Sequence, residues 1–223
     1  SEMCIRDRCI TKPGKFVAIG LNYSDHAKET GAKTPTEPIV FMKATSSISG
    51  PYDDIEMPKD SSKLDWEVEL AVVIGKETKN ISEKEVSDHI LGYCIVNDVS
   101  EREWQLEKSG QWVKGKSADT FGPTGPYLVT QDEIPDINNL NLILEVNGKK
   151  MQSGNTKNMI FNVNFLISYL SKFMSLQPGD LITTGTPAGV GMGMKPQVFL
   201  KSGDNIKLSI DFLGEQNSKV VIK

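Results

Sequence analysis

The stretch Asp65-Trp66-Glu67-Val68-Glu69-Leu70-Ala71-Val72-Val73-Ile74 determines how the rest of this 223-residue chain is interpreted. Its alternation predicts a β-strand, in which residues two apart share a face. One face carries Trp66, Val68, Leu70, Val72 and Ile74, and the other carries Glu67 and Glu69 followed by Ala71 and Val73. Because the acidic face becomes apolar within the same strand, we expect both faces to be buried.

Two neighbouring carboxylates on a buried face must be protonated, paired with bases or bound to a cation. No Lys or Arg lies within the strand, so a metal ion is the simplest explanation. A second apolar run, from Gly92, ends in the carboxylate of Asp98. Glu67, Glu69 and Asp98 therefore form a candidate set of oxygen ligands, which suits Mg²⁺ or Mn²⁺, with Ca²⁺ as a further option. The ordinary alternative is a half-exposed strand with a solvated acidic end.

The composition excludes several classes of partner. The net charge is -4 and no run of basic residues is present, which argues against nucleic acid. No apolar stretch approaches the roughly 20 residues of a membrane helix, and the first residues do not form a signal peptide. Three cysteines without paired spacing indicate reduced thiols in a cytoplasmic protein, and with only two histidines they disfavour zinc.

The domain organisation is predicted to be simple. Residues 1–10 are mixed, charged and unpatterned, and we interpret them as a segment that need not be native. Residues 11–223 are predicted to form a single catalytic domain. Predicted strands outnumber helices and are not spaced as βαβ units, so the fold class is mixed α/β, β-rich, with a mixed or antiparallel sheet.

Further elements follow from local patterns. Strands are predicted at 16–20, 39–43, 142–146, 149–151, 181–185 and 206–212, and Asn147-Gly148 predicts a hairpin turn. A short helix is expected from a Ser24 cap to Gly31, and a second from the capping box at Ser82–Glu85 to near Gly92. The apolar stripe from Phe161 to Phe173 predicts the longest helix.

Two groups of residues suggest acid–base and anion chemistry. His26 and Glu29 share a helical face, so the carboxylate could orient the imidazole as a general base, although an ordinary surface pair has the same spacing. Arg102 and Gln105 follow Asp98 at helical intervals, and Lys116 lies between a glycine and a serine, where it could bind an anion or stabilise an oxyanion. Their ordinary alternative is a solvated surface.

The glycine-rich segment from Thr183 to Gly193 could form a nest of N–H groups for a carboxylate. It is not a phosphate-binding P-loop, because no Gly-Lys-Ser/Thr closes it. It is not a convincing dinucleotide fingerprint either, because the required helix start is missing.

Taken together, these segments resemble the fumarylacetoacetate hydrolase family. The matching pieces occur in the family's order: Gly20-Leu21-Asn22-Tyr23 with His26 and Glu29; Asp65-Trp66-Glu67-Val68-Glu69; Asn97-Asp98-Val99-Ser100 with Arg102 and Gln105; Gly115-Lys116-Ser117; and Thr184-Gly185-Thr186-Pro187. The segment from Gln111 to Pro123 and Gly154-Asn155-Thr156 resemble the branch of bacterial 2,4-diketo-3-deoxy sugar-acid hydrolases, whose members are often labelled ureidoglycolate lyase.

The resemblance implies a fumarylacetoacetate hydrolase-like mixed-β roll, a homodimer and a Mg²⁺ or Mn²⁺ site. Glu67, Glu69 and Asp98 match the family's metal ligands, and His26 and Glu29 match its water-activating pair. Lys116 matches a catalytic oxyanion contact, while Arg102, Gln105 and Thr186 match substrate contacts, Thr186 holding the substrate carboxylate. Some members have a fourth metal carboxylate where this chain has Val17-Ala18-Ile19-Gly20, so water or substrate would fill that coordination position.

The function expected from these residues is metal-dependent hydrolysis of a carbon–carbon bond in 2,4-diketo acids of the acylpyruvate type, including 3-deoxy sugar acids, to pyruvate and a carboxylic acid. An oxaloacetate-type decarboxylase, a ureidoglycolate lyase and a dienoate isomerase are alternatives on the same site. A non-catalytic protein that binds a metal and an organic acid is the alternative of another class.

Two structural expectations accompany this function. Segment 22–38 is predicted to form a mobile lid that carries His26 and Glu29. Four aromatic residues lie in or beside one long loop, and some of them are predicted to pack against a second subunit, with lining of the active-site wall as the alternative: Trp104, Trp112, Phe121 and Tyr127.

Overall fold

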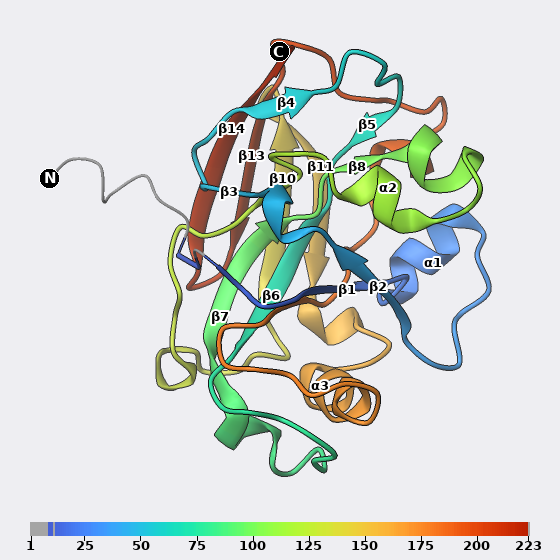
Figure 1. The fold of residues 1–223 in the computed structure, drawn as a ribbon. Coiled ribbons are helices and arrows are strands. Elements are labelled where there is room, and N and C mark those ends of the chain that lie inside the picture. Colours follow the sequence, from blue (N-terminus) through green and yellow to red (C-terminus); the bar gives the residue numbers. More distant parts are fainter. Residues whose placement is uncertain (1–8, 11, 223) are drawn as a thin grey trace, which may run out of the picture.

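The computed structural model describes residues 9–10 and 12–222, and two five-stranded sheets dominate it (Figure 1). The first sheet has the strand order β2-β1-β12-β6-β7. Its strands are β2 (Ile39–Lys43), β1 (Phe16–Gly20), β12 (Leu181–Thr183), β6 (Val68–Ile74) and β7 (Ile90–Asn97). The β1–β12 pair is parallel and the other pairs are antiparallel, so the sheet is mixed, as predicted.

The second sheet has the order β11-β10-β13-β14-β4. Its strands are β11 (Lys149–Asn155), β10 (Asn141–Val146), β13 (Asn205–Ile210), β14 (Gly214–Ile222) and β4 (Ile55–Met57). Two small ladders join β3 (Ile48–Ser49) to β9 (Gly122–Pro123) and β5 (Leu64–Asp65) to β8 (Ser100–Glu101). Together these sheets form the β-rich mixed fold that the sequence predicts.

Strand β6 lies at the centre of the packing, because both its faces are covered. Alternate residues, among them Leu70 and Val72, belong to the large apolar cluster shared with β10 and β13 of the second sheet. The residues between them, Ala71 and Val73, pack in a second cluster with Phe16, Cys94 and others. All seven residues of β6 are buried, which confirms the prediction of two buried faces.

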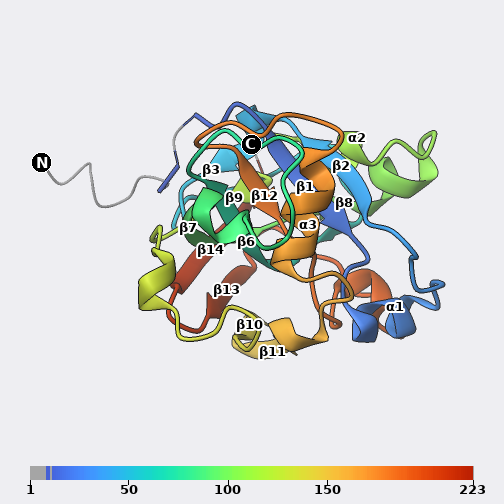
Figure 2. The same cartoon turned by 90° about the horizontal axis from the view of Figure 1, so that it is seen from below.

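The described residues form three α-helices, which lie at the periphery: α1 (Ser24–Thr30), α2 (Trp112–Lys116) and α3 (Val163–Ser171). Figures 1 and 2 show α1 and α2 on the same side of the molecule in both views. Short turns complete the chain: the 3-10 turns Thr45–Ser47, Val86–His89, Gln131–Glu133, Thr156–Asn158 and Gly191–Gly193, and a π-helical turn at Glu103–Glu107.

The predicted hairpin and one helix end are confirmed. Asn147 and Gly148 both have positive φ, 52° and 75°, as the two-residue turn between β10 and β11 requires. Gly31 ends α1 in the left-handed conformation with φ 68°. The predicted Ser24 cap is wrong, because Tyr23 holds the N-cap position and makes no side-chain cap bond.

Other boundaries differ for local reasons. The expected strand 65–74 is interrupted at Trp66-Glu67, where the amide of Glu67 donates to the side chain of Asn97 instead of to a strand partner. Helix α3 begins at Val163 rather than Phe161, because the Asn162 side chain caps it through the amide of Phe165. The strand predicted at 181–185 ends at Thr183 and the one at 206–212 ends at Ile210.

The helix predicted from Ser82 to near Gly92 is wrong. Glu85 accepts hydrogen bonds from the amide and hydroxyl of Ser82, so half of the capping box forms. Only the 3-10 turn Val86–His89 follows, because β7 already begins at Ile90 to pair with β6. Strand β14 was missed, because Gln216 and Ser218 on its buried face hide the hydrophobic alternation.

The division into residues 1–10 and 11–223 stays a prediction. Residues 1–8 lie outside the described residues. Cys9 and Ile10 are described, and both pack against the second apolar cluster.

Candidate metal centre and active site

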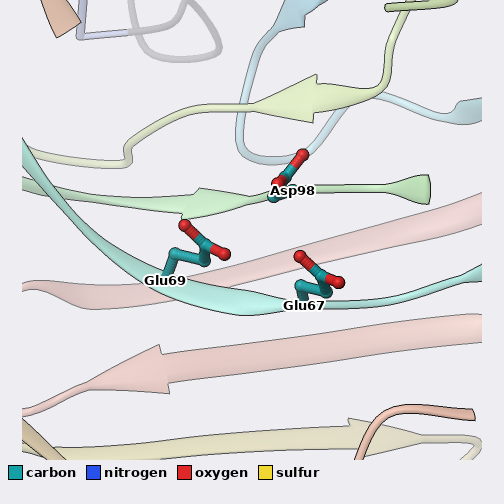
Figure 3. Close-up of side chains that lie close together, drawn as sticks. All are labelled: Glu67, Glu69 and Asp98. Carbon is teal, nitrogen blue, oxygen red and sulfur yellow. The ribbon is translucent and has the colours of Figure 1, made fainter. Parts of the chain in front are cut away.

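Three buried carboxylates meet at the end of strands β6 and β7 (Figure 3). Glu67 directly precedes β6, Glu69 lies within it, and Asp98 directly follows β7. One oxygen from each lies within 4.8 Å of the others. Adjacent antiparallel strands explain the arrangement, because Val68 pairs with Asn97 and so places both glutamates beside Asp98.

Three cations surround this acidic group. Lys116 Nζ lies 2.8 Å from Glu67 Oε2 and 2.7 Å from Asp98 Oδ2. Arg102 Nη2 lies 2.7 Å from Glu67 Oε1, and Lys43 Nζ lies 2.5 Å from Asp98 Oδ1. Sequence reasoning looked for bases within the strand and found none, whereas these cations come from other elements.

The carboxylates differ in electrostatics. Burial raises the pKa of Glu69, and the neighbouring charges of Asp98 and Glu67 raise it further. Burial also opposes ionisation of Glu67, but Lys116 and Arg102 outweigh it and hold the pKa of that carboxyl below its ordinary value. Burial acts against the ammonium of Lys116, yet Asp98 and Glu67 raise its pKa, so Lys116 carries a proton at neutral pH. Glu69 is therefore the carboxylate that lacks a cation.

The donor set fits a hard divalent cation. All three groups offer oxygen, and each carboxylate oxygen can accept more than one bond, so the ion pairs of Glu67 and Asp98 leave acceptor capacity. Glu69 accepts a hydrogen bond from the backbone amide of Gly185 at 3.0 Å. A bound cation would compensate the free-energy cost of burying the Glu69 charge. A buried acidic group that can bind a divalent metal is thus present, and its identity as Mg²⁺ or Mn²⁺ stays a prediction.

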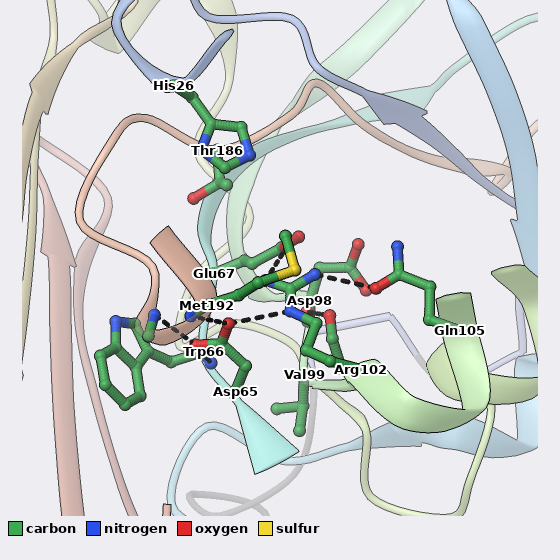
Figure 4. Close-up of polar contacts among 12 residues, drawn as sticks. His26, Asp65, Trp66, Glu67, Asp98, Val99, Arg102, Gln105, Thr186 and Met192 are labelled. Carbon is green, nitrogen blue, oxygen red and sulfur yellow. Dashed lines mark hydrogen bonds and ion pairs between the residues drawn. The ribbon is translucent and has the colours of Figure 1, made fainter. Parts of the chain in front are cut away.

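His26 and Glu29 lie on α1. His26 approaches Glu67 from the side opposite to Asp65 and Arg102 (Figure 4). Glu29 Oε2 lies 3.4 Å from His26 Nδ1, and the same carboxylate accepts from the amide of Gly189. A proton on Nδ1 leaves Nε2 as the acceptor. His26 is only 6% exposed and lines the cavity that contains Glu67 and Glu69. Helix α1 is docked in this structure, and its predicted mobility as a lid stays a prediction.

The predicted anion contacts are brought to the same cavity. Its lining includes Arg102, Gln105, Lys116 and Thr186, and its volume is about 200 Å³. Figure 4 shows His26 and Thr186 on one side of Glu67, and Asp65 and Arg102 on the other. The four lining residues are buried, so the alternative of a solvated surface does not hold for them. Their catalytic and substrate-binding roles stay predictions.

The hydrogen bonds of two of these residues limit what they can do. Gln105 Oε1 accepts from Arg102 Nη1 at 2.9 Å, which leaves its amide nitrogen as the donor end. The Thr186 hydroxyl donates to the carbonyl of Val68 at 3.0 Å and accepts from Gln152 at 2.8 Å. Thr186 must therefore exchange its donor bond before its hydroxyl can hold a substrate carboxylate.

The glycine-rich segment does supply amides to carboxylates, and the carboxylates are the protein's own. Gly185 donates to Glu69, Gly189 to Glu29, and Gly191 and Met192 to Asp65. The segment consequently contacts the acidic group through Glu69, helix α1 through Glu29, and the partner of Arg102 through Asp65.

Sequence reasoning missed two residues of this network. Asp65 is fully buried and accepts from Arg102 Nε at 2.8 Å as well as from the glycine-rich segment. Lys43 ends β2 and is 2% exposed. The sequence did carry a signal for Lys43, because a lysine that closes an apolar strand needs an acidic partner if the strand end is buried.

The four aromatic residues of the long loop have separate positions. Trp112 lines the cavity, with its ring centroid 5.3 Å from that of Phe41, so the active-site wall is the correct alternative for this residue. Phe121 lies in the large apolar cluster. Trp104 contacts Lys108, and Tyr127 is 60% exposed. The homodimer stays a prediction.

Comparison with known proteins gives a family match for nearly the whole chain. The family model for the fumarylacetoacetate (FAA) hydrolase C-terminal region matches residues 15–221. The chain belongs to the fumarylacetoacetate hydrolase family. The sequence resemblance is thereby confirmed at the level of the family.

Relatives and solved structures extend the comparison. A Burkholderia ambifaria protein named "Putative hydrolase" is 61% identical over 93% of this chain and 74% of its own length. The fumarylacetoacetate hydrolase from Exiguobacterium antarcticum has a TM-score of 0.91 at 40% identity, over 97% of this chain and 78% of that one. The 2-hydroxyhepta-2,4-diene-1,7-dioate isomerase from Mycobacterium marinum has a TM-score of 0.85 at 39% identity, over 97% and 77%.

These similarities support the predicted fold and an enzyme of this family, whose solved members include a hydrolase and an isomerase. Within residues 9–10 and 12–222, no helix has the length and apolar character needed to cross a membrane.

Proposed function

We propose that this chain is a divalent-metal-dependent hydrolase that cleaves a carbon–carbon bond in 2,4-diketo acids of the acylpyruvate type. The products would be pyruvate and a carboxylic acid. One observation carries the proposal: the acidic group of Glu67 and Glu69 and the His26–Glu29 pair face the same small cavity.

Glu67, Glu69 and Asp98 would hold Mg²⁺ or Mn²⁺. When bound there, such an ion supplies Lewis-acid stabilisation of negative charge on the oxygens of a 2-oxo acid. Lys43 and Lys116 both contact the Asp98 carboxylate. These ion pairs hold the side chains of Asp98 and Lys116 in fixed positions relative to each other.

The remaining steps are assigned to side chains of this chain. His26, oriented by Glu29, takes a proton from water, and the resulting hydroxide adds to the carbonyl carbon remote from the substrate carboxylate. The Lys116 ammonium and the Gln105 amide donate to the oxyanion that develops there. The carbon–carbon bond then breaks, its electron pair passes to the pyruvate side, and a proton returns to that carbon.

The test is a panel of acylpyruvates assayed for pyruvate with Mg²⁺ or Mn²⁺, beside oxaloacetate assayed for CO₂. Pyruvate formation that disappears with EDTA supports the hydrolase. CO₂ release without acylpyruvate cleavage would instead support an oxaloacetate-type decarboxylase.

An isomerase is the second candidate, because the similar structure from Mycobacterium marinum is named as a dienoate isomerase. Isomerisation moves a proton within the substrate and needs no attacking water, so it would not need His26 to activate one. A ureidoglycolate lyase is separated in the same panel by its own substrate. Binding of metal and 2-oxo acids without turnover of any substrate would support the non-catalytic alternative.

A further inference from the structure

Much of the cavity lining is apolar. Its apolar lining residues include Ile19, Leu21, Phe41, Leu106, Trp112 and Met192. Trp112 is held over the backbone of Gly20, where an added Cβ would lie 2.4 Å from the indole ring, and its edge packs on Phe41. At about 200 Å³ the cavity is smaller than the roughly 300–1,000 Å³ of drug-sized sites. A compact substrate is therefore required, and a far end that contacts these residues meets apolar surface.

The fixed positive charges that line the cavity already have partners. Arg102 pairs with Glu67 and Asp65, and Lys116 pairs with Glu67 and Asp98. Among the described lining residues no other Lys or Arg is present, and the neighbouring Lys33 is exposed and does not line the cavity. The Lys116 ammonium lies 5.3 Å from the centroid of the Phe41 ring, but it is already paired with two carboxylates. Among the described lining residues, no Lys or Arg is thus left without a carboxylate partner to pair with a substrate's far group.

Hydrogen-bonding capacity at the wall is also limited. The hydroxyl groups of Thr30 and Thr186 donate to backbone carbonyls of His26 and Val68. The side-chain carbonyl oxygen of Gln105 accepts a hydrogen bond from Arg102. A tail with several hydroxyl groups would lose hydration without gaining an equal number of partners.

We propose that the substrate's far group is an uncharged alkyl or aryl group, so that this chain selects acylpyruvates with apolar tails over dicarboxylates and over hydroxylated sugar acids. This inference rests on the proposed function, because it takes the 2-oxo acid end to lie at the acidic group. The specificity-determining residues are Phe41, Leu106 and Trp112. Burial of apolar surface favours such a tail, while an unpaired carboxylate in the same place would lose its water.

The experiment measures binding rather than turnover, with Mn²⁺ present throughout. Calorimetry compares 2-oxohexanoate with 2-oxoadipate, which share the 2-oxo acid end and differ in a terminal methyl or carboxylate. We expect 2-oxohexanoate to bind at least tenfold more tightly. From 2-oxobutyrate to 2-oxopentanoate to 2-oxohexanoate, each added methylene should tighten binding about fourfold.

A charge placed in the wall provides the matched variant. Leu106 lines the cavity and is 44% exposed, so Leu106→Lys should fold, and we expect it to raise the affinity for 2-oxoadipate about tenfold relative to the affinity for 2-oxobutyrate. Val113→Lys adds the same charge nearby, at a 40% exposed residue that does not line the cavity, and should leave both affinities unchanged.

The outcomes separate the two proposals. Equal or tighter binding of 2-oxoadipate by the unmodified chain overturns the apolar-tail inference and leaves the proposed function standing. An equal gain in Leu106→Lys and Val113→Lys also overturns it, because the effect would then be general electrostatic attraction. Absence of metal-dependent binding of every 2-oxo acid overturns the proposed function and this inference with it.

Discussion

At the scale of single residues, Glu69 differs from the two carboxylates beside it. Glu67 and Asp98 each contact two cationic side chains, whereas Glu69 accepts a hydrogen bond from the backbone amide of Gly185. Its pKa is raised because burial and two neighbouring carboxylates oppose its charge. The folded chain without metal therefore holds a proton at Glu69 that the unfolded chain releases near its ordinary pKa of 4.5.

The raised pKa of Glu69 makes the free energy of unfolding depend on pH. A raised folded pKa stabilises the fold below the unfolded pKa, and that contribution is lost as pH rises through the folded pKa. Without metal, we expect the free energy of unfolding to fall between pH 5 and pH 8, by about 1.4 kcal/mol for each pH unit of that range lying below the folded pKa. Glu69→Gln should remove most of this decrease, as measured by urea unfolding in EDTA.

Glu67→Gln is the control with the opposite electrostatics. The pKa of Glu67 is lowered, so its contribution is present above the unfolded pKa and lost only as pH falls through the folded pKa. This variant should be less stable at both pH 5 and pH 8 without a change in slope. Identical slopes for the unmodified chain and Glu69→Gln would contradict the assignment.

His26 carries the second residue-scale prediction. His26→Ala should lower acylpyruvate turnover by about 10²–10⁴-fold, the range for a lost acid–base group, with Mn²⁺ affinity nearly unchanged. Oxaloacetate decarboxylation, if the chain performs it, should be spared because no water attacks. The other histidine, His89, lies on a turn and contacts Thr78, so His89→Ala should retain activity. Full hydrolase activity in His26→Ala would contradict the water-activation role of His26.

At the scale of elements, the segment after β12 joins parts of the site that are distant in sequence. Its amides hold Glu69, Glu29 and Asp65. Gly189 has a φ of 105°, and an added Cβ would lie 2.0 Å from the carbonyl oxygen of Met151. The close approach to β11 therefore requires glycine at this position.

Gly189→Ala should consequently reduce the free energy of unfolding by about 3–5 kcal/mol, since it adds a backbone clash to the cost of positive φ. Gly203→Ala is the matched control, because Gly203 has a φ of 97° with no atom within 4 Å of an added Cβ. It should cost about 1–2 kcal/mol, from the left-handed conformation alone. Chemical denaturation measures both, and equal costs would show that the contact with Met151 is readily relieved.

At the scale of the whole molecule, metal binding should be visible as stability. An ion that binds only the folded chain at 100 times its Kd adds about 2.7 kcal/mol. For a chain of this size that corresponds to an increase in Tm of about 5–10 °C. Glu69→Gln should abolish the increase with Mn²⁺ or Mg²⁺, while Glu215→Gln, an exposed carboxylate paired with Lys207, should retain it. An unchanged Tm for the unmodified chain at millimolar metal would contradict the site.

The homodimer also belongs to this scale. Large apolar side chains remain exposed among the described residues, including Tyr127 at 60% and Phe173 at 65%. Burial of such groups between two copies would stabilise a dimer. Sedimentation at micromolar concentration should give twice the chain mass of 24.6 kDa, and a single-chain mass would contradict the proposal.

Local patterns in the sequence were sufficient for the strands around Val68–Ile74, the Asn147-Gly148 hairpin and the meeting of Glu67, Glu69 and Asp98. Alternation, turn conformation and strand-end position depend on neighbouring residues, so they can be read without knowing the fold. The capping box at Ser82 shows the limit, since pairing of Ile90 with β6 prevailed over a local helix signal.

Only the tertiary structure decided which groups neutralise the carboxylates and what the cavity wall contains. Lys43 and Asp98 are 55 residues apart, and Gly191 and Asp65 are 126 apart, so these contacts depend on which elements the sheets bring together. Trp112 could have faced a partner or the site, and packing on Gly20 and Phe41 placed it in the cavity. The physical reason is that charge pairing and shape complementarity act through space, whereas periodicity acts along the chain.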